Sequence, residues 1–254
     1  MLSEKPWNRE LLLLLLSALL LSWCLGMVFG ILLEQILPLD AVAAKSFYHF
    51  VISTLTFHVA TLLLVHQFLK LNGASWKQFL GLSKPHLARA ILFAIVAAIL
   101  VLPMIWILRV WSARVMNVVR LEPVPQPSIK ALESAVSVGQ QICFGAAAIL
   151  LAPLAEEALF RGILYPFLKQ RGHRLVAFFG TSFLFALFHS NVVTFLPLAF
   201  FAFVLIFIYE KTDKLVAPIL THAFFNAVNF FFFIFAAELN HFFQQVNRFL
   251  HQLR

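Results

Sequence analysis

Long apolar runs alternate with short polar segments along almost the whole chain. Most runs approach the roughly 20 residues of helix that a hydrocarbon layer about 30 Å thick requires. A segment in lipid must pair its own backbone groups, so we expect each run to form an α-helix. The pattern predicts an all-α fold, a polytopic transmembrane helix bundle of about 7–8 spans. The runs cover residues 11–33, 46–69, 90–108, 139–168, 174–189, 193–209 and 215–237.

The composition is also that of a membrane protein. Hydrophobic residues make up 62% of the chain and charged residues only 12%, against about a quarter charged in typical soluble domains. The net charge of +8 is spread between the apolar runs, which favours contact with anionic lipid headgroups over nucleic-acid binding. We therefore expect an integral, multi-pass membrane protein that has lipids as partners and binds no nucleic acid. The compact length and the lack of targeting features favour a bacterial plasma membrane.

The pattern divides the chain into three parts. Residues 1–138 hold three spans and an interfacial connection, and residues 139–237 hold the more polar helices. In the tail, residues 238–254, Phe and Leu recur at helical spacing with His, Gln and Arg between them. This spacing fits an amphipathic helix in the membrane interface, or equally an ordinary packing helix.

Ionisable side chains inside apolar runs need an explanation, because each is costly in lipid. The second half of the chain carries three such clusters: EEALFR at 156–161, FALFH at 185–189 and HAFFN at 222–226. A helix–helix turn at KQRGH, residues 169–173, would bring the first two clusters to a similar depth, roughly 22 and 27 Å from the turn. We expect the clusters to share one polar cavity within the membrane.

Helix geometry separates the two adjacent glutamates of the first cluster. Glu157 and Arg161 are four residues apart, so they can pair on one face of a helix. Glu156 is rotated by about 100° from Glu157, and it is free to face the cavity and His189. One glutamate is therefore interpreted as structural and the other as chemical. The alternative is a buried ion network that only fixes helix packing.

Other polar residues also fall in apolar runs. His222 and Asn226 are four residues apart and share one face of the last span. His49, His58 and His66 lie in the second span, at helical angles that do not coincide and without a carboxylate beside them. We interpret these three as hydrogen-bonded helix histidines outside the site.

The three clusters resemble the motifs of the CAAX protease and bacteriocin-processing (CPBP) family, whose pattern is EExxxR, then FxxxH, then HxxxN. Every position is filled in that order, over roughly residues 139–237. The resemblance implies a glutamic-type intramembrane endopeptidase, similar to the Ras-converting CAAX endopeptidase. Its substrates would be of the CAAX type or bacteriocins and other peptides in maturation. Glu157 and Arg161 would hold the helix and orient the first glutamate.

The resemblance also implies catalytic roles for four residues. Glu156 would be the general base that activates water, assisted by His189. His222 and Asn226 would donate hydrogen bonds to the tetrahedral intermediate. The partner would be a peptide or a membrane-associated protein substrate, and no cofactor is implied.

Two other functions remain open at this point. Glu156, His189 and His222 form a Glu–His–His set of the kind that zinc hydrolases use, so a zinc-dependent membrane protease is one alternative. Against it, the chain has no HExxH motif. A non-enzymatic membrane immunity or scaffold protein built around the same cavity is the other alternative.

Overall fold

The computed structural model describes residues 2–236 except 6, 37–41, 84, 121, 123 and 125. These residues form helices and connections, and none of them lies in a strand. The amphipathic helix predicted for residues 238–254 lies outside the described residues.

Among the described residues, six helical segments are long and apolar enough to cross a membrane, and a shorter apolar one covers Val176–Phe188. The first three are α1 (Arg9–Ile36), then α2 (Val42–Ser53) with η1 (Thr54–Val59) and α3 (Ala60–Leu71), then α5 (Leu87–Val118). The fourth joins α7 (Val138–Ala146), η2 (Ala147–Leu151), α8 (Ala152–Glu157), η3 (Ala158–Leu164) and α9 (Tyr165–Gln170). The fifth and sixth are α11 (Val192–Thr212) and α12 (Val216–Ile234), and the shorter apolar segment joins η4 (Val176–Gly180) and α10 (Thr181–Phe188). Two short helices, α4 (Trp76–Phe79) and α6 (Pro127–Glu133), lie in the connections. The predicted polytopic helix bundle is confirmed, and the number of spans stays a prediction.

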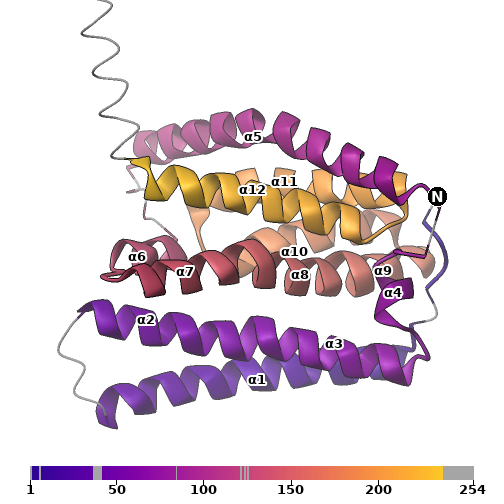
Figure 1. Ribbon diagram of the computed structural model, residues 1–254, viewed down its shortest axis with the longest axis horizontal. Coiled ribbons are helices and arrows are strands. Elements are labelled where there is room, and N and C mark those ends of the chain that lie inside the picture. Colours follow the sequence, from indigo (N-terminus) through magenta and orange to yellow (C-terminus); the bar gives the residue numbers. More distant parts are fainter. Residues whose placement is uncertain are drawn as a thin grey trace, which may run out of the picture.

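The segments run back and forth between two ends of the molecule (Figure 1). One layer holds α1 and the α2–α3 segment, and α5 lies on the opposite side. The α7–α9 segment lies between them, and α12 packs against both α8 and α5. Of the six long segments, Val138–Gln170 has the largest buried share. The span that contains Glu156, Glu157 and Arg161 is therefore the most enclosed of the six.

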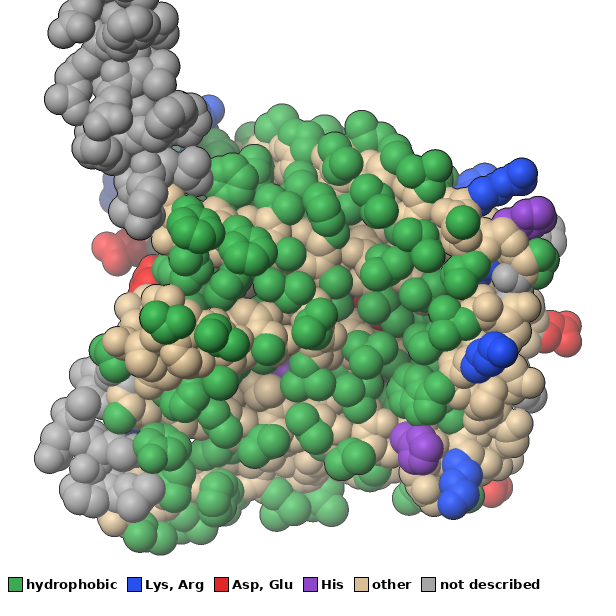
Figure 2. Space-filling model, viewed as in Figure 1, with side chains coloured by type: hydrophobic (Ala, Val, Ile, Leu, Met, Phe, Trp, Pro, Cys, Tyr) green, Lys and Arg blue, Asp and Glu red, His purple; other side chains and the backbone are tan. Residues whose placement is uncertain are grey.

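The surface matches a membrane environment. The face in Figure 2 is largely hydrophobic, and Lys, Arg and His side chains gather along the edge near the N-terminus. Large apolar side chains such as Leu14, Leu100 and Leu150 are at least 60% exposed. Soluble proteins rarely expose apolar patches of this extent. The chain is an integral, multi-pass membrane protein.

A turn separates the fourth segment from η4 and α10, as the sequence predicts. The α9 helix ends at Gln170, and Gly172 adopts φ +90° before the next helix begins. The helix before this turn continues through Glu156 and Arg161 without a break. Both features were required for Glu156 and His189 to reach a similar depth.

In the part of the chain that the structure describes, four short π-helical segments interrupt the regular α-helix. A π-turn shifts the backbone pairing from i−4 towards i−5 and so leaves carbonyl groups for other donors. In lipid such groups need a replacement partner. Side chains supply one in three segments: Ser22 Oγ to the Thr56 carbonyl (2.9 Å), Asn226 Nδ2 to Ala148 (2.7 Å) and Trp7 Nε1 to Gly162 (3.0 Å). In the fourth segment the Ala177 carbonyl accepts from both the backbone N–H of Thr181 and its Oγ1 (2.6 Å). Two of these bonds, from Ser22 and Asn226, join two different helical segments, and the bond from Trp7 joins the N-terminal segment to the bundle.

The N-terminal segment is tied into the bundle. Trp7 is buried, and its indole donates to the carbonyl of Gly162 in η3. Gly162 lies so close to Phe79 that an added Cβ would be 2.3 Å from the Phe79 ring. Ser3 donates from its backbone nitrogen to Asp213 Oδ1 (3.0 Å). These contacts fix η3, which carries Arg161, against the end of the molecule.

Candidate active site

The core of the candidate site is the pair formed by Glu157 and Arg161. The predicted i, i+4 contact is present, with 2.8 Å between Arg161 Nη1 and Glu157 Oε1. Both side chains are buried, with 0 and 1% exposure. Arg161 Nη2 also donates to the Ala202 carbonyl (3.3 Å), and the guanidinium lies 4.5 Å from the centre of the Phe185 ring. The cation is thus enclosed by a carboxylate, a carbonyl and an aromatic face.

His222 from α12 lies between the two glutamates of α8. Its Nδ1 contacts Glu157 Oε1 at 2.9 Å, and its Nε2 lies 3.9 Å from Glu156 Oε2. The ring is packed edge-on against Phe185 and Phe201. An ionised carboxylate only accepts hydrogen bonds, so His222 Nδ1 carries a hydrogen towards Glu157. The other nitrogen is therefore the one presented to Glu156.

Glu156 has a contact that the sequence analysis missed. His58 from η1 in the second span places its Nε2 3.4 Å from Glu156 Oε1. We interpreted all three histidines of this span as lying outside the site. That is correct for His49, which contacts Glu34, and for His66, which accepts from Trp76 Nε1 (3.0 Å). It is wrong for His58.

Two features explain why the sequence did not reveal His58. Its partner is 98 residues further along the chain, so no local spacing connects them. Its position on a π-helical segment also invalidates an angle counted at 3.6 residues per turn. One signal was available: an ionisable residue in an apolar run is by default a candidate for function.

His189 lies at the end of α10, half-buried, with its ring beside Phe185. Its Nδ1 donates to the Phe185 carbonyl (2.9 Å), because a carbonyl oxygen can only accept. The Phe185 ring packs against both His189 and His222, so His189 lies beside the site on α10. No direct hydrogen bond joins His189 to the Glu156 carboxylate.

Asn226 lies one turn beyond His222 on α12. Its Nδ2 donates to the Ala148 carbonyl in η2 (2.7 Å). Asn229, a further residue on this face, accepts from Trp106 Nε1 (3.1 Å) and donates to the Phe225 carbonyl. Asn226 is thus held at the π-helical segment that precedes the two glutamates, while Asn229 links α12 to α5.

Two oxygens in this cluster have no hydrogen-bond partner among the described residues. They are Glu156 Oε2 and Glu157 Oε2, and both are buried. Buried polar atoms without partners are uncommon and call for an explanation. At Glu156 the unpaired oxygen is the one that faces His222, between side chains from two different segments.

A zinc site was an alternative expectation for Glu156, His189 and His222. Among the described residues, no group of three His, Cys, Asp or Glu side chains is arranged to hold a metal ion. His189 and His222 each use Nδ1 for a hydrogen bond, to Phe185 and to Glu157, so only Nε2 of each ring could bind a metal. The zinc-dependent alternative stays a prediction that a chelator experiment tests.

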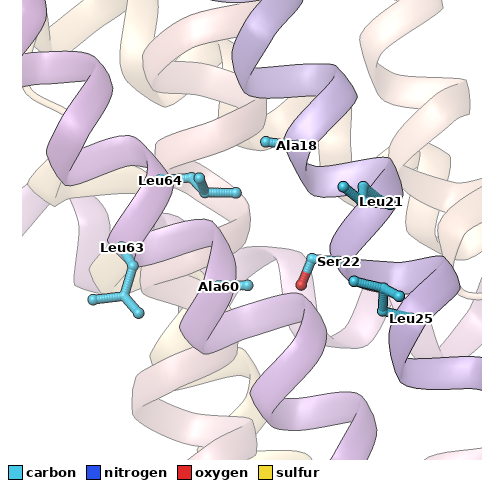
Figure 3. A pocket seen from close by; sticks show the side chains of 7 residues that line it. All are labelled: Ala18, Leu21, Ser22, Leu25, Ala60, Leu63 and Leu64. Atoms are coloured by element: carbon cyan, nitrogen blue, oxygen red, sulfur yellow. The ribbon is translucent and has the colours of Figure 1, made fainter. Parts of the chain in front are cut away.

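An apolar groove of about 370 Å³ lies elsewhere, between α1 and α3 (Figure 3). Ser22 is its one hydroxyl-bearing side chain, and that hydroxyl already donates to the Thr56 carbonyl. The groove thus has no free acid or base and is separate from the polar cluster. Its lining residues are Ala18, Leu21, Ser22, Leu25, Ala60, Leu63 and Leu64.

Comparison with known proteins supports a specific class. Residues 138–228 match the family model described as type II CAAX prenyl endopeptidase Rce1-like. No curated protein and no solved structure matches the chain. The matched segment contains both glutamates, Arg161, His189, His222 and Asn226, inside a bundle of apolar helices. The protein is a membrane protease, a hydrolase that acts on peptide bonds.

Within that class, residues 138–228 of the chain are similar to the CAAX protease and bacteriocin-processing family, of which the Rce1-like endopeptidases are members. The resemblance inferred from the three clusters is thereby confirmed. His58 lies outside the matched segment, in the part of the chain that supplies the second span.

Proposed function

We propose that the chain hydrolyses peptide bonds of membrane-associated substrates with a water molecule activated by Glu156. One observation carries the proposal: a nearly buried carboxylate lies 3.4 Å from His58 and 3.9 Å from His222, and these histidines come from two other spans. A carboxylate in such a site can take a proton from water, and imidazoles can relay it. The family match supports the protease activity itself.

In the proposed reaction Glu156 Oε2 takes a proton from water, and the hydroxide attacks the carbonyl carbon of the substrate. His189 assists from α10. Its Nδ1–H is held by the Phe185 carbonyl, so Nε2 of the neutral ring carries the lone pair. The proton then passes to the amide nitrogen as the C–N bond breaks. The products are a carboxylate and an amine.

The developing oxyanion would be stabilised from α12. Asn226 uses one Nδ2 hydrogen for the Ala148 carbonyl, and its second hydrogen is left for the intermediate. A His222 ring with hydrogens on both nitrogens would donate from Nδ1 to Glu157 and present Nε2–H to the oxyanion. Glu157 and Arg161 would hold this ring in position.

The proposed substrate lies in or on the membrane. The cluster is enclosed between apolar spans, so a peptide would approach from the lipid or from the membrane edge. We propose a CAAX-type C-terminus or a bacteriocin-like peptide in maturation, and a bacterial plasma membrane as the location. The family description supports the CAAX-type substrate.

The test uses the purified full chain reconstituted in liposomes. The probes are an internally quenched, farnesylated peptide that ends in Cys-a-a-X and the same peptide without the farnesyl group. Wild-type protein is expected to cleave the farnesylated probe, and Glu156→Gln should lower kcat by about 10²- to 10⁴-fold. Glu133→Gln, which changes an exposed glutamate of α6, is the matched control and should leave turnover unchanged.

Three outcomes would count against parts of the proposal. Full turnover by Glu156→Gln would falsify the role of this base. Cleavage of neither probe would exclude CAAX-type substrates. Inhibition by a strong chelator, with recovery on adding zinc, would instead favour the zinc-dependent alternative.

A further inference from the structure

His58 contacts the proposed general base from outside the family-matched segment. Its Nε2 lies 3.4 Å from Glu156 Oε1, and the side chain is 21% exposed, against 11% for Glu156. The ring packs edge-on against Phe57. His58 belongs to the second span, which the match over residues 138–228 does not include. The site thus includes a residue that the three motifs do not contain.

The two oxygens of Glu156 have different surroundings. Oε1 is hydrogen-bonded to His58 Nε2. Oε2 lies 3.9 Å from His222 Nε2 and has no hydrogen-bond partner among the described residues. The terminal torsion of a glutamate is broad, so a carboxylate without a fixed partner can rotate and exchange its oxygens. A donor on Oε1 limits that rotation. It also keeps Oε2 turned towards the side chains proposed to handle water and oxyanion.

We infer that His58 is a positioning residue: by donating from Nε2 to Glu156 Oε1 it reserves Oε2 as the oxygen that takes the proton from water. This inference rests on the proposed function of Glu156 as general base. Because an ionised carboxylate only accepts, the hydrogen in this contact belongs to His58. Partners of this kind, one step removed from the chemistry, orient the reacting group.

The other histidines of the second span argue against a general packing role. His49 and His66 are exposed, and their partners Glu34 and Trp76 lie at the two ends of the span. His58 lies midway between them, on the π-helical segment Thr54–Val59, and its partner is a motif residue. His66 therefore provides a control in the same span, with its own hydrogen bond and no contact to Glu156.

Kinetics with the farnesylated quenched peptide separate positioning from other roles. His58→Leu removes the donor and should lower kcat by about 10- to 100-fold, with KM little changed. His58→Gln places an amide donor near the position of Nε2 and should recover most of that loss. His66→Leu should keep wild-type kcat. A wild-type kcat for His58→Leu, an effect on KM alone, or equal loss in the Gln and Leu variants would each overturn the inference.

A spectroscopic measurement tests the contact without turnover. Full-length protein with ¹⁵N-labelled histidine is studied in lipid bilayers, and His58→Gln identifies the His58 signals. Glu156→Gln replaces the charged carboxylate that accepts from His58 with a neutral amide. The His58 Nε2 resonance should therefore shift, while the Nε2 resonance of His66 does not. An unchanged His58 resonance would overturn the inference, even if His58→Leu does not fold.

The two proposals can fail separately. If Glu156→Gln keeps full turnover, the proposed function fails, whatever the His58 variants do. If Glu156→Gln is inactive and His58→Leu is fully active, only the positioning role of His58 fails.

Discussion

Two clusters in the described part of the chain combine a carboxylate, a cation and an imidazole. Near the end of α1, Glu34 contacts Lys45 at 3.0 Å and also contacts His49. Within the fourth span, Glu157 contacts Arg161 at 2.8 Å and His222 at 2.9 Å. The side chains of the first cluster are 34–49% exposed, and those of the second 0–4%.

The difference in burial changes what the same chemical groups can do. Exposed ion pairs typically contribute about 0–1 kcal/mol to stability. Buried ions must offset several kcal/mol of desolvation each, and the pair is stable only with good geometry and further hydrogen bonds. In the second cluster Ala202 and Phe185 provide that support for Arg161. Charge pairing alone therefore does not identify a site in this chain; enclosure of the pair by other spans does.

The largest effect is expected when the glutamate of the enclosed cluster is replaced by glutamine. Glu157→Gln leaves the buried Arg161 without its carboxylate and should destabilise the protein by about 3–5 kcal/mol. The measurement is unfolding by SDS in mixed micelles, followed by tryptophan fluorescence. A loss below 1 kcal/mol would mean that Arg161 finds other compensation, and the contrast with the exposed cluster would no longer hold.

A smaller effect is expected at Gly162, next to Arg161. An added Cβ would be 2.3 Å from the Phe79 ring and 3.0 Å from Leu215, so Gly162→Ala should cost about 1–3 kcal/mol through overpacking. Gly139→Ala is the matched control, since its Cβ would meet only Ser137 Oγ at 3.9 Å. Equal stability of the two variants in the same unfolding assay would contradict the close packing at η3.

The smallest effect is expected in the exposed cluster. Glu34→Gln removes the charge that contacts Lys45 and His49 and should change stability less than Glu157→Gln or Gly162→Ala, because all three side chains of this cluster are exposed to solvent. What remains of the effect should shrink at high salt, since exposed charges are screened. Unfolding at low and high salt measures both. A loss as large as that of Glu157→Gln would erase the distinction between the two clusters.

Much of the fold could be predicted from sequence because the physics is local. Hydrophobic runs of spanning length follow from the thickness of the bilayer. The turn after α9 follows from the polar stretch around Gly172, and the contact of Glu157 with Arg161 follows from the i, i+4 spacing. Each of these depends on residues that lie close together in the chain.

The remainder of the site depends on contacts between distant segments. Nothing near His58 in the sequence indicates Glu156, and nothing near Arg161 indicates that its guanidinium faces Phe185. The carbonyl that Asn226 reaches is available because η2 is π-helical, and periodicity alone does not reveal such segments. The sequence therefore identified the motif residues and the pair formed by Glu157 and Arg161, whereas the partners that come from other helical segments required the packed structure.

The attachment of Trp7 to Gly162 and of Ser3 to Asp213 constrains how the protein matures in the membrane. A ribosome makes these amino-terminal residues first, but their partners emerge more than 150 and 200 residues later. The N-terminal segment can therefore bind its partners only after the fourth and fifth spans have been synthesised. Its binding is thus a late event in biogenesis, and it requires that the helix carrying the two glutamates is already in place.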